Sequence, residues 1–569
     1  MATPLLSIND LSVSFHVGDQ VVNAIRDISF NVHAGEIVAL VGESGSGKSV
    51  TSLSMLQLLP SPPARVDQGT ILFNEDGNRP VDLLRCSIAE RQKIRGNKIS
   101  MIFQEPMTSL NPVFTCGYQV GEAILAHHKL TKQEAKKRTI AWFEKVKLPN
   151  PADLYSRYPH QLSGGQKQRV MIAMAMCCKP SLLICDEPTT ALDVTVQKNV
   201  LELIKTLQRE TGMGVIFITH DLGVVKQIAD RAIVMFKGKI VEQGPVNDIF
   251  HKAQHPYTKA LIACRPVNHK RGQRLPVVRD FLNSEPELQP QLATPKAIQQ
   301  QKPASEATRK TLVSVEHLSV WFTNKKNWLG RPISYVKAVN DISFEVYENE
   351  TLGIVGESGC GKSTLGRTLL QLIPATSGTI KYKEQNLNRY NPAQLRELRR
   401  HLQIVFQDPY SSLNPRQKIG AAIEEPLKVH GLFKTAAQRK QRTQELLQKV
   451  GLMPEHYDRY PHEFSGGQRQ RIVIARALAL QPSFIICDES VSALDVSVQA
   501  QVLNLLNDLK KEFGFTIVFI SHDLSVVRYF SDRILVMNRG EIEEIGPADD
   551  IYESPEKEYT KRLIDAIPQ

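Results

Sequence analysis

The chain has 569 residues, enough for two or more domains that each have their own core. Hydrophobic residues make up 42% and charged residues 23%, which excludes the disordered and fibrous classes. The formal net charge is +11, but the basic residues form no dense run interleaved with aromatics, so we expect no nucleic-acid partner. The longest apolar run, Val170–Cys178, is far shorter than the roughly 20 residues that span a bilayer.

The N-terminal segment Met1–Asp10 lacks the charged-then-apolar pattern of a signal peptide. We therefore expect the protein in the cytoplasm, with any membrane role exercised through partners. None of the eight cysteines forms a C-x-x-C pair, which argues against a disulfide framework or a zinc site. A reduced compartment is the simpler interpretation.

Short apolar runs precede the main loops in both halves of the chain. They have strand length and are apolar throughout, as expected of parallel strands that are buried on both faces. Helical stretches lie between them, so each half is predicted to be an α/β domain around a largely parallel sheet. The predicted strands are Ile37–Val41, Ser181–Cys185, Val215–Thr219, Thr351–Val355, Phe484–Cys487 and Thr516–Ser521.

The two halves are copies of one domain. The motif Gly42–Ser49 recurs as Gly356–Ser363, and later motifs recur at a fixed spacing of 302 positions, as for Asp186 and Asp488. Between the phosphate loop and Gln104 the first copy carries 11 extra residues. They lie around Leu59–Arg79, and we predict that they form a longer surface loop.

The copies are predicted to span residues 1–264 and 311–569. Residues 265–310 between them are rich in proline and glutamine, and we predict a flexible linker there. A coil of this length reaches roughly 35–40 Å on average, enough for the two domains to face each other.

A glycine-rich phosphate loop follows the first strand of each copy. Its glycines let backbone N–H groups turn toward phosphates, its lysine neutralises them, and its serine reaches Mg²⁺ at the start of a helix. Cys360 replaces Ser46, and we interpret it as a small filler rather than a redox switch. The predicted nucleotide-binding residues are Gly42, Glu43, Ser44, Gly45, Ser46, Gly47, Lys48 and Ser49, with Gly356, Glu357, Ser358, Gly359, Cys360, Gly361, Lys362 and Ser363 in the second copy.

An Asp-Glu pair ends a second apolar strand in each copy. Asp186 and Asp488 are predicted to hold Mg²⁺ through water. Glu187 and Glu489 would then lie beside the metal, where a carboxylate can orient and polarise the attacking water. A solvated glutamate at a strand end is the alternative, which the phosphate loop in the same domain makes the weaker one.

The sequence Ser-Gly-Gly-Gln opens a helix in each copy. A serine before glycines at a helix start can be a simple cap, but it also makes an anion site. Because it lies 23 residues before the Asp of the strand-end pair in both copies, we favour the anion site. The residues are Ser163, Gly164, Gly165 and Gln166, and Ser465, Gly466, Gly467 and Gln468.

This combination of motifs resembles the ATP-binding-cassette (ABC) superfamily over nearly the whole chain outside 265–310. In that family two domains pack head to tail, with each ATP between the phosphate loop of one and the Ser-Gly-Gly-Gln signature of the other. The resemblance implies ATP and Mg²⁺ as ligands. It also implies an antiparallel β portion and a helical signature subdomain in each copy.

Carried over to this sequence, the resemblance implies two hydrolysis-competent sites within one chain. The catalytic set would be Glu187, His220 and Gln104, with Glu489, His522 and Gln407 in the second copy. Magnesium would be held, partly through water, by Ser49, Gln104 and Asp186, and by Ser363, Gln407 and Asp488. Asp193 and Asp495 would join the opposite sites, and Phe15 and Phe322 would take the place of the adenine-stacking aromatic, usually Tyr. Ser490 departs from the usual proline, which Pro188 keeps in the first copy.

Within the superfamily the chain resembles the peptide, opine and nickel importers, and most of all the fused ATP-binding proteins of glutathione importers. The segments that carry this resemblance are 104–112, 407–416, 157–165, 186–195, 459–471, 490–497 and the tail His255–Thr258. It implies an ATP-hydrolysing motor for the import of glutathione or small peptides. Import of dipeptides, oligopeptides or microcin-like peptides stays an alternative, as does a soluble ATPase that acts on ribosomes or nucleic acid.

The resemblance also implies partners that the chain does not itself contain. They are two membrane-spanning permease subunits and a periplasmic substrate-binding protein. The expected location is therefore the cytoplasmic face of a bacterial inner membrane, as a peripheral protein.

Overall fold

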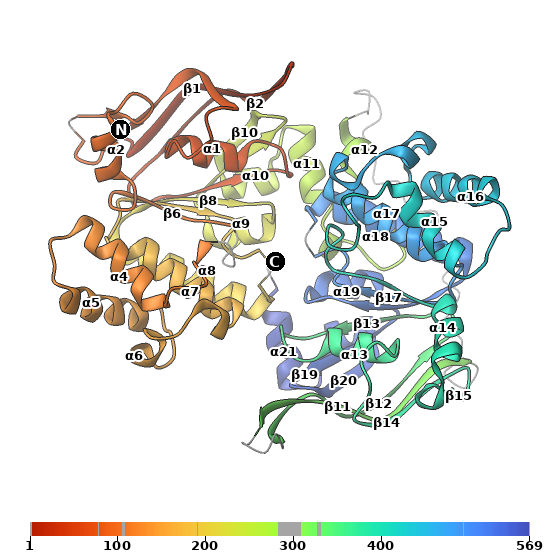
Figure 1. The fold of residues 1–569 in the computed structure, drawn as a ribbon. Helices are drawn as coiled ribbons and strands as arrows, with labels where there is room; N and C mark the ends of the chain where they lie inside the picture. Colours follow the sequence, from red (N-terminus) through yellow and green to blue (C-terminus); the bar gives the residue numbers. More distant parts are fainter. Residues whose placement is uncertain are drawn as a thin grey trace.

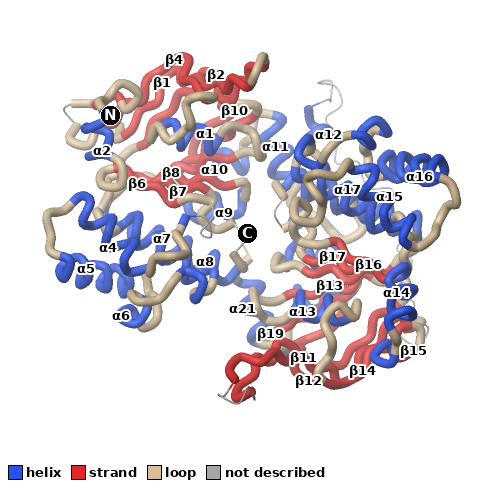
Figure 2. The backbone as a smooth tube through the Cα atoms, viewed as in Figure 1, coloured by secondary structure: helices blue, strands red, loops and turns tan. Residues whose placement is uncertain are grey.

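The computed structural model describes residues 3–77, 79–104, 109–190, 192–282, 309–326, 332–492 and 494–567. It has two similar halves, and each contains an antiparallel sheet, a mostly parallel sheet and a group of helices (Figures 1 and 2). The halves are inverted relative to each other: the antiparallel sheet lies at the top of the first half and at the bottom of the second (Figure 1).

The elements of the first half alternate strands and helices after an initial antiparallel pair. They are β1 (Leu6–Val17), β2 (Gln20–Val32), β3 (Ile37–Val41), α1 (Lys48–Met55), β4 (Ala64–Phe73), β5 (Val81–Asp82), α2 (Ile88–Ile94), β6 (Ile99–Ile102), α4 (Cys116–His127), α5 (Lys132–Lys145), α6 (Pro151–Leu154), η1 (Pro159–Gln161), α7 (Gly164–Met176), β7 (Leu182–Asp186), α8 (Val194–Thr211), β8 (Gly214–Thr219), α9 (Leu222–Ile228), β9 (Arg231–Phe236), β10 (Lys239–Pro245), α10 (Val246–His251), α11 (Pro256–Ala263), η2 (Pro266–Asn268) and α12 (Val278–Leu282).

The second half repeats this order. Its elements are β11 (Thr311–Lys326), β12 (Pro332–Tyr347), β13 (Thr351–Val355), α13 (Lys362–Leu369), β14 (Ser377–Tyr382), β15 (Gln385–Asn386), η4 (Leu387–Arg389), α14 (Pro392–His401), β16 (Leu402–Val405), α15 (Ile419–Val429), α16 (Ala436–Lys449), η5 (Pro454–Asp458), η6 (Pro461–Glu463), α17 (Gly466–Leu478), β17 (Phe484–Asp488), α18 (Val496–Phe513), β18 (Thr516–Ile520), α19 (Leu524–Phe530), β19 (Arg533–Asn538), β20 (Glu541–Pro547), α20 (Ala548–Glu553) and α21 (Glu558–Asp565).

The core sheet of each half is parallel except at one edge, which confirms the predicted α/β class. Its strand order is β10-β9-β3-β8-β7-β6 in the first half and β16-β17-β18-β13-β19-β20 in the second. Only the edge pairs β9–β10 and β19–β20 are antiparallel. All six predicted strands lie in these sheets, and β3, β7, β13 and β17 are buried along their whole length.

The antiparallel portion of each half is a separate four-stranded sheet, β2-β1-β4-β5 and β12-β11-β14-β15. Here the prediction of a surface loop around Leu59–Arg79 is wrong, because the strand β4 lies within that insert. It pairs with β1 from Leu6–Phe73 to Phe15–Ala64, and it has ten residues where its counterpart β14 has six. Ile71 and Phe73 are buried in the core, so the apolar side chains of the insert stabilise a strand.

The helical group of the first half contains α4, α5 and α7, and that of the second contains α15, α16 and α17 (Figure 1). In the first half these helices bury Val120, Phe143 and Met171 against one face of the core sheet. The antiparallel sheet covers the other face, where Ile8 of β1 shares a buried cluster with Val38 and Ile184 of the core sheet. This confirms the predicted helical subdomain.

The segment after α11 packs against the second half. Leu275 is fully buried, and its N–H donates to Asn504 Oδ1 (3.0 Å) while its carbonyl accepts from Asn504 Nδ2 (2.8 Å). Tyr529 Oη donates to the carbonyl of Gln273 (2.5 Å), and Arg271 pairs with Asp532. We call residues 266–282 the strap; Figure 1 places its helix α12 beside α17 and α18. The remainder of the predicted linker, 283–308, lies outside the described residues.

Among the helices of the described residues, none is both long and apolar enough to cross a membrane.

Candidate functional site

The two phosphate loops have the same geometry at the ends of β3 and β13. Lys48 Nζ donates to the carbonyls of Gly42 (2.7 Å) and Glu43 (3.0 Å), and Lys362 repeats this with Gly356 and Glu357 at 2.7 and 2.9 Å. The lysine is thereby drawn back across its own loop. Burial lowers the pKa of Lys48, and the carboxylates of Asp495, Glu187 and Asp186 oppose that shift.

Glycine is required where each loop turns into its helix. Gly47 has φ 103°, and a Cβ there would lie 2.8 Å from the carbonyl oxygen of Ala24. Gly361 has φ 110°, and a Cβ there would lie 2.0 Å from the carbonyl oxygen of Ala338. A side chain would meet backbone on the neighbouring strand in addition to an unfavourable φ, so both turns depend on glycine.

A serine and an aspartate meet beside each lysine. Ser49 Oγ donates to Asp186 Oδ1 (3.1 Å), and Ser363 Oγ donates to Asp488 Oδ1 (2.8 Å). Burial raises the pKa of Asp186 to about 6 despite that hydrogen bond, and it raises the pKa of Asp488 as well. A buried carboxylate of this kind gains most from a nearby cation.

The next residue, a glutamate, is the centre of a polar cluster. Glu187 Oε2 accepts from Gln104 Nε2 (3.0 Å) and from Thr190 Oγ1 (3.0 Å), and Oε1 lies 3.3 Å from His220 Nδ1. In the second half Glu489 Oε2 accepts from Gln407 Nε2 (2.9 Å) and lies 3.3 Å from His522 Nδ1. The structure therefore brings together the predicted glutamate, glutamine and histidine of each copy.

Charge and burial have opposite effects on the pKa values of these glutamates. Burial by itself would raise the pKa of Glu187, but the hydrogen bond and charge of His220 hold that pKa at about 2. The pKa of Glu489 is lowered by His522 in the same way. Each glutamate is thus an ionised carboxylate, the state that can accept a proton from water.

Both glutamates have a strained backbone. Their φ angles are 47° for Glu187 and 49° for Glu489, in the left-handed region that residues other than glycine rarely adopt. Each N–H is fixed to the neighbouring strand, at the carbonyls of Ile218 and Ile520. Strain held in place by surrounding structure is typical of functional sites.

A family model described as "ABC transporter" matches residues 25–190 and 339–492. A second, "Oligopeptide/dipeptide transporter, C-terminal region", matches residues 241–291 and 544–569. The chain belongs to the ABC transporter family. The first model covers the phosphate loop and the Asp-Glu pair of both halves, and the second covers the whole strap.

Curated ABC relatives match over nearly the full chain. The glutathione import ATP-binding protein GsiA of Escherichia coli strain K12 is 48% identical over 570 residues, which are 99% of this chain and 89% of the relative. The protein of the same name from Salmonella typhimurium strain LT2 is 48% identical over 566 residues, with the same coverage.

The ABC signature residues begin α7 and α17 as caps. Ser163 Oγ accepts from the N–H of Gln166 (3.3 Å), and Gln166 Oε1 accepts from the N–H of Ser163 (3.1 Å). Ser465 and Gln468 form the same box. Within the described residues no hydrogen bond links a signature to the opposite phosphate loop, so the anion-site assignment stays a prediction.

The two ABC halves do make contact at the first phosphate loop. The N–H of Ser44 donates to Asp495 Oδ2 (3.0 Å), and Ser497 Oγ donates to Glu43 Oε1. Asp193, the counterpart of Asp495, instead caps α8 by accepting from the N–H of Val196 (2.9 Å). In this structure the second half therefore contacts the first phosphate loop more closely than the first half contacts the second phosphate loop.

The predicted adenine-stacking residues lie on the antiparallel sheets. Phe15 on β1 is opposite Val22, and Phe322 on β11 is opposite Val336. Phe322 is 44% exposed, so its ring is available to a ligand. Nothing in the structure tests the stacking role, which stays a prediction.

The sequence did not lead us to predict the tyrosine that supports each phosphate loop. Tyr257 Oη on α11 accepts from the N–H of Glu43 (3.0 Å), and Tyr559 Oη on α21 accepts from the N–H of Glu357 (3.1 Å). Burial raises the pKa of both phenols far above its usual range. The signal was present, because both tyrosines belong to the Tyr-Thr tail that recurs in the two copies.

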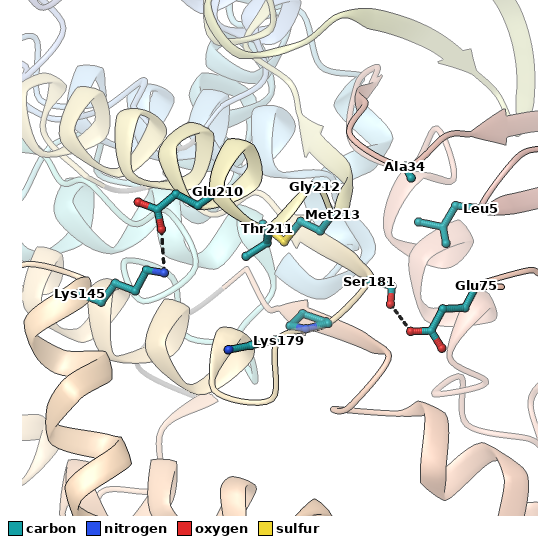
Figure 3. Close-up of a pocket in the computed structure, with 11 residues that line it drawn as sticks. Leu5, Ala34, Glu75, Lys145, Lys179, Ser181, Glu210, Thr211, Gly212 and Met213 are labelled. Atoms are coloured by element: carbon teal, nitrogen blue, oxygen red, sulfur yellow. Dashed lines mark hydrogen bonds and ion pairs between the residues drawn. The ribbon is translucent and has the colours of Figure 1, made fainter. Parts of the chain in front are cut away.

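A cavity of about 450 Å³ lies elsewhere in the first half (Figure 3). It is lined by helix and strand ends, and its polar pairs are Lys145–Glu210 (2.7 Å) and Ser181–Glu75. It contains none of the predicted site residues. It lies apart from both phosphate loops and both Asp-Glu pairs, so we do not assign it a part in the site.

Proposed function

We propose that this chain is the ATP-hydrolysing motor of a bacterial ABC importer for glutathione or small peptides. The observation that carries the proposal is the 48% identity, over 99% of the chain, to glutathione import ATP-binding proteins. Both halves keep the glutamate, glutamine and histidine in contact with one another. In both, the aspartate is hydrogen-bonded to the serine and the lysine to its own loop. Two intact clusters support hydrolysis in both halves.

In each half we assign separate tasks to the clustered residues. The phosphate loop and its lysine would bind the β- and γ-phosphates, which draws Lys48 away from its own loop carbonyls. Glu187 would accept a proton from the attacking water while Gln104 and His220 hold its carboxylate. Glu489, Gln407 and His522 would act in the same way in the second half.

The residues also fit Mg²⁺. A serine hydroxyl and a buried carboxylate lie side by side in both halves, and hard oxygen ligands are those that Mg²⁺ prefers. Ser49, Asp186 and Gln104 would hold the ion in the first half, and Ser363, Asp488 and Gln407 in the second, partly through water. When bound, the ion neutralises charge that develops on the phosphate oxygens.

We further propose that the two halves pair head to tail within the chain. The contacts of Asp495 and Ser497 with the first phosphate loop and the inverted arrangement of the halves support this pairing. ATP that bridges a loop and the opposite signature would stabilise only the closed pairing, so hydrolysis would reopen it. That motion is what a transporter can use.

Transport requires partners. We propose two membrane-spanning permease subunits and a periplasmic substrate-binding protein, with this chain on the cytoplasmic face of the inner membrane. Selectivity would lie in those partners, so general dipeptide or oligopeptide import is the second candidate. The match to the oligopeptide/dipeptide C-terminal region favours that candidate specifically.

Uptake of labelled glutathione and of a labelled dipeptide separates the candidates. Cells that lack the gene are complemented with the wild-type chain or with the Lys48→Ala/Lys362→Ala double variant. Loss of glutathione uptake alone, restored only by the wild type, supports glutathione; loss of dipeptide uptake moves the substrate to peptides. Unchanged uptake of both refutes the importer, and copurification with ribosomes would point to the soluble class.

A further inference from the structure

The catalytic glutamates of the two halves are held differently. Both carboxylate oxygens of Glu187 are engaged: His220 lies at Oε1, and Gln104 and Thr190 donate to Oε2. In the second half Gln407 and His522 both lie at Oε2 of Glu489. Oε1 of Glu489 has no hydrogen bond to the residues that the structure describes, so this carboxylate has one fewer restraint on its rotation.

The missing restraint is a hydroxyl. Ser492 occupies the position of Thr190, 302 residues later, and its Oγ is buried without a hydrogen-bond partner in the described structure. Thr190 has a β-branched side chain, whose second substituent restricts χ1. Serine lacks that methyl group, so nothing directs its hydroxyl toward the glutamate.

The surroundings of the two glutamates also restrain Glu187 more than Glu489. The Glu187 side chain is 10% exposed and that of Glu489 is 14% exposed, and the residue after each is Pro188 and Ser490 respectively. Proline fixes its own φ near −65°, which restrains the turn that follows Glu187. Each difference makes the first site the more rigid one.

We infer that Thr190 is a positioning residue for Glu187 and that it makes the first site the faster of the two hydrolytic sites. The inference rests on the proposed function, because it presumes that Glu187 accepts the proton from the attacking water. A carboxylate with fewer orientations keeps its acceptor oxygen aligned with the water, and misalignment by a fraction of an ångström lowers the rate.

The test isolates the first site by placing every variant in a Glu489→Gln background of the full-length chain. Thr190→Val removes the hydroxyl at nearly constant volume, and Thr190→Ser keeps it. Single-turnover release of phosphate from labelled ATP gives the rate, and binding of a fluorescent ATP analogue gives the affinity. The matched control is Ser492→Ala, measured in a Glu187→Gln background.

We expect Thr190→Val to slow phosphate release about tenfold, as loss of a hydrogen bond to a charged group does, with affinity changed less than about twofold. Thr190→Ser should recover most of the rate, and Ser492→Ala should have no effect. A rate for Thr190→Val within twofold of its parent, or a loss of affinity alone, overturns the inference. So does a Glu489→Gln parent that releases no phosphate.

The proposed function fails separately. Steady hydrolysis by the Glu187→Gln/Glu489→Gln double variant would refute the assignment of the two glutamates. If that double variant is inactive and Thr190→Val is normal, only the role of Thr190 is refuted.

Discussion

Docking of the strap can be broken at one side chain. Asn504 on α18 is 4% exposed, and its carboxamide makes both hydrogen bonds to the backbone of Leu275. Asn504→Leu keeps the size of the side chain but leaves an N–H and a carbonyl of the strap buried without partners. The perturbation therefore acts on the contact between the halves and not on either phosphate loop.

The magnitude follows from those two groups. Each buried polar group left without a partner costs about 1–3 kcal/mol, so the variant should weaken docking of the strap by about 2–6 kcal/mol. Even the lower figure corresponds to about a 30-fold loss in the docking equilibrium. Leu275 and Val278 are buried with the strap, so their apolar surface is exposed when it leaves.

The assay cuts the chain between the halves. A protease recognition sequence is inserted within 283–308, the chain is cleaved, and a tag on the first half is used to recover the second half without nucleotide. We expect the halves of the wild-type sequence to stay together and those of Asn504→Leu to separate. Glu202→Leu is the matched control, because Glu202 lies 302 positions earlier on α8, where it is exposed. Equal recovery with Asn504→Leu and with the wild type would refute the reasoning, as would separation of the wild-type halves.

Three other predictions follow from burial and charge. Tyr257→Phe removes the hydroxyl that accepts from Glu43, so the KM for ATP should rise roughly threefold to tenfold in hydrolysis kinetics; a shift of the melting temperature alone would contradict this. Burial raises the pKa of the Cys116, Cys264 and Cys360 thiols, whereas Cys86 is half-exposed. Maleimide should therefore label Cys86 first. A fast phase of labelling that survives in Cys86→Ser would contradict this prediction. Burial lowers the pKa of Lys510 from 10.5 to about 8. Between those pH values the unfolded chain holds the extra proton, so this lysine's contribution to the free energy of unfolding rises with pH. Urea titrations at pH 8 and at pH 10.5 should show that rise relative to Lys510→Met, and an equal pH dependence of the two proteins would refute it.

Much of the site could be predicted because its chemistry is local in sequence. The phosphate loop places its lysine six residues after the first glycine, and the observed bond from Lys48 to the carbonyl of Gly42 follows from that spacing. The buried strands were equally predictable, since their apolar runs are uninterrupted from end to end.

What escaped prediction depends on residues far apart in the chain. The strap is secured by Asn504 and Tyr529, more than 200 positions after it, and neither residue carries a sign of its partner in the sequence around it. The predicted boundaries of the linker remain a prediction. The apolar residues of the insert were misjudged because proline and glycine around them favour turns, while pairing with β1 decided the outcome.

The bond between Ser44 and Asp495 has a consequence for communication within the chain. A carboxylate and a phosphate compete for the same backbone N–H, so a nucleotide that binds the first loop would release Asp495. The freed side chain can then cap α18, which has no side-chain cap in this structure, as Asp193 already caps α8. Nucleotide binding in the first half would thus stabilise the N-terminus of α18 in the second half, through the carboxylate of Asp495 alone.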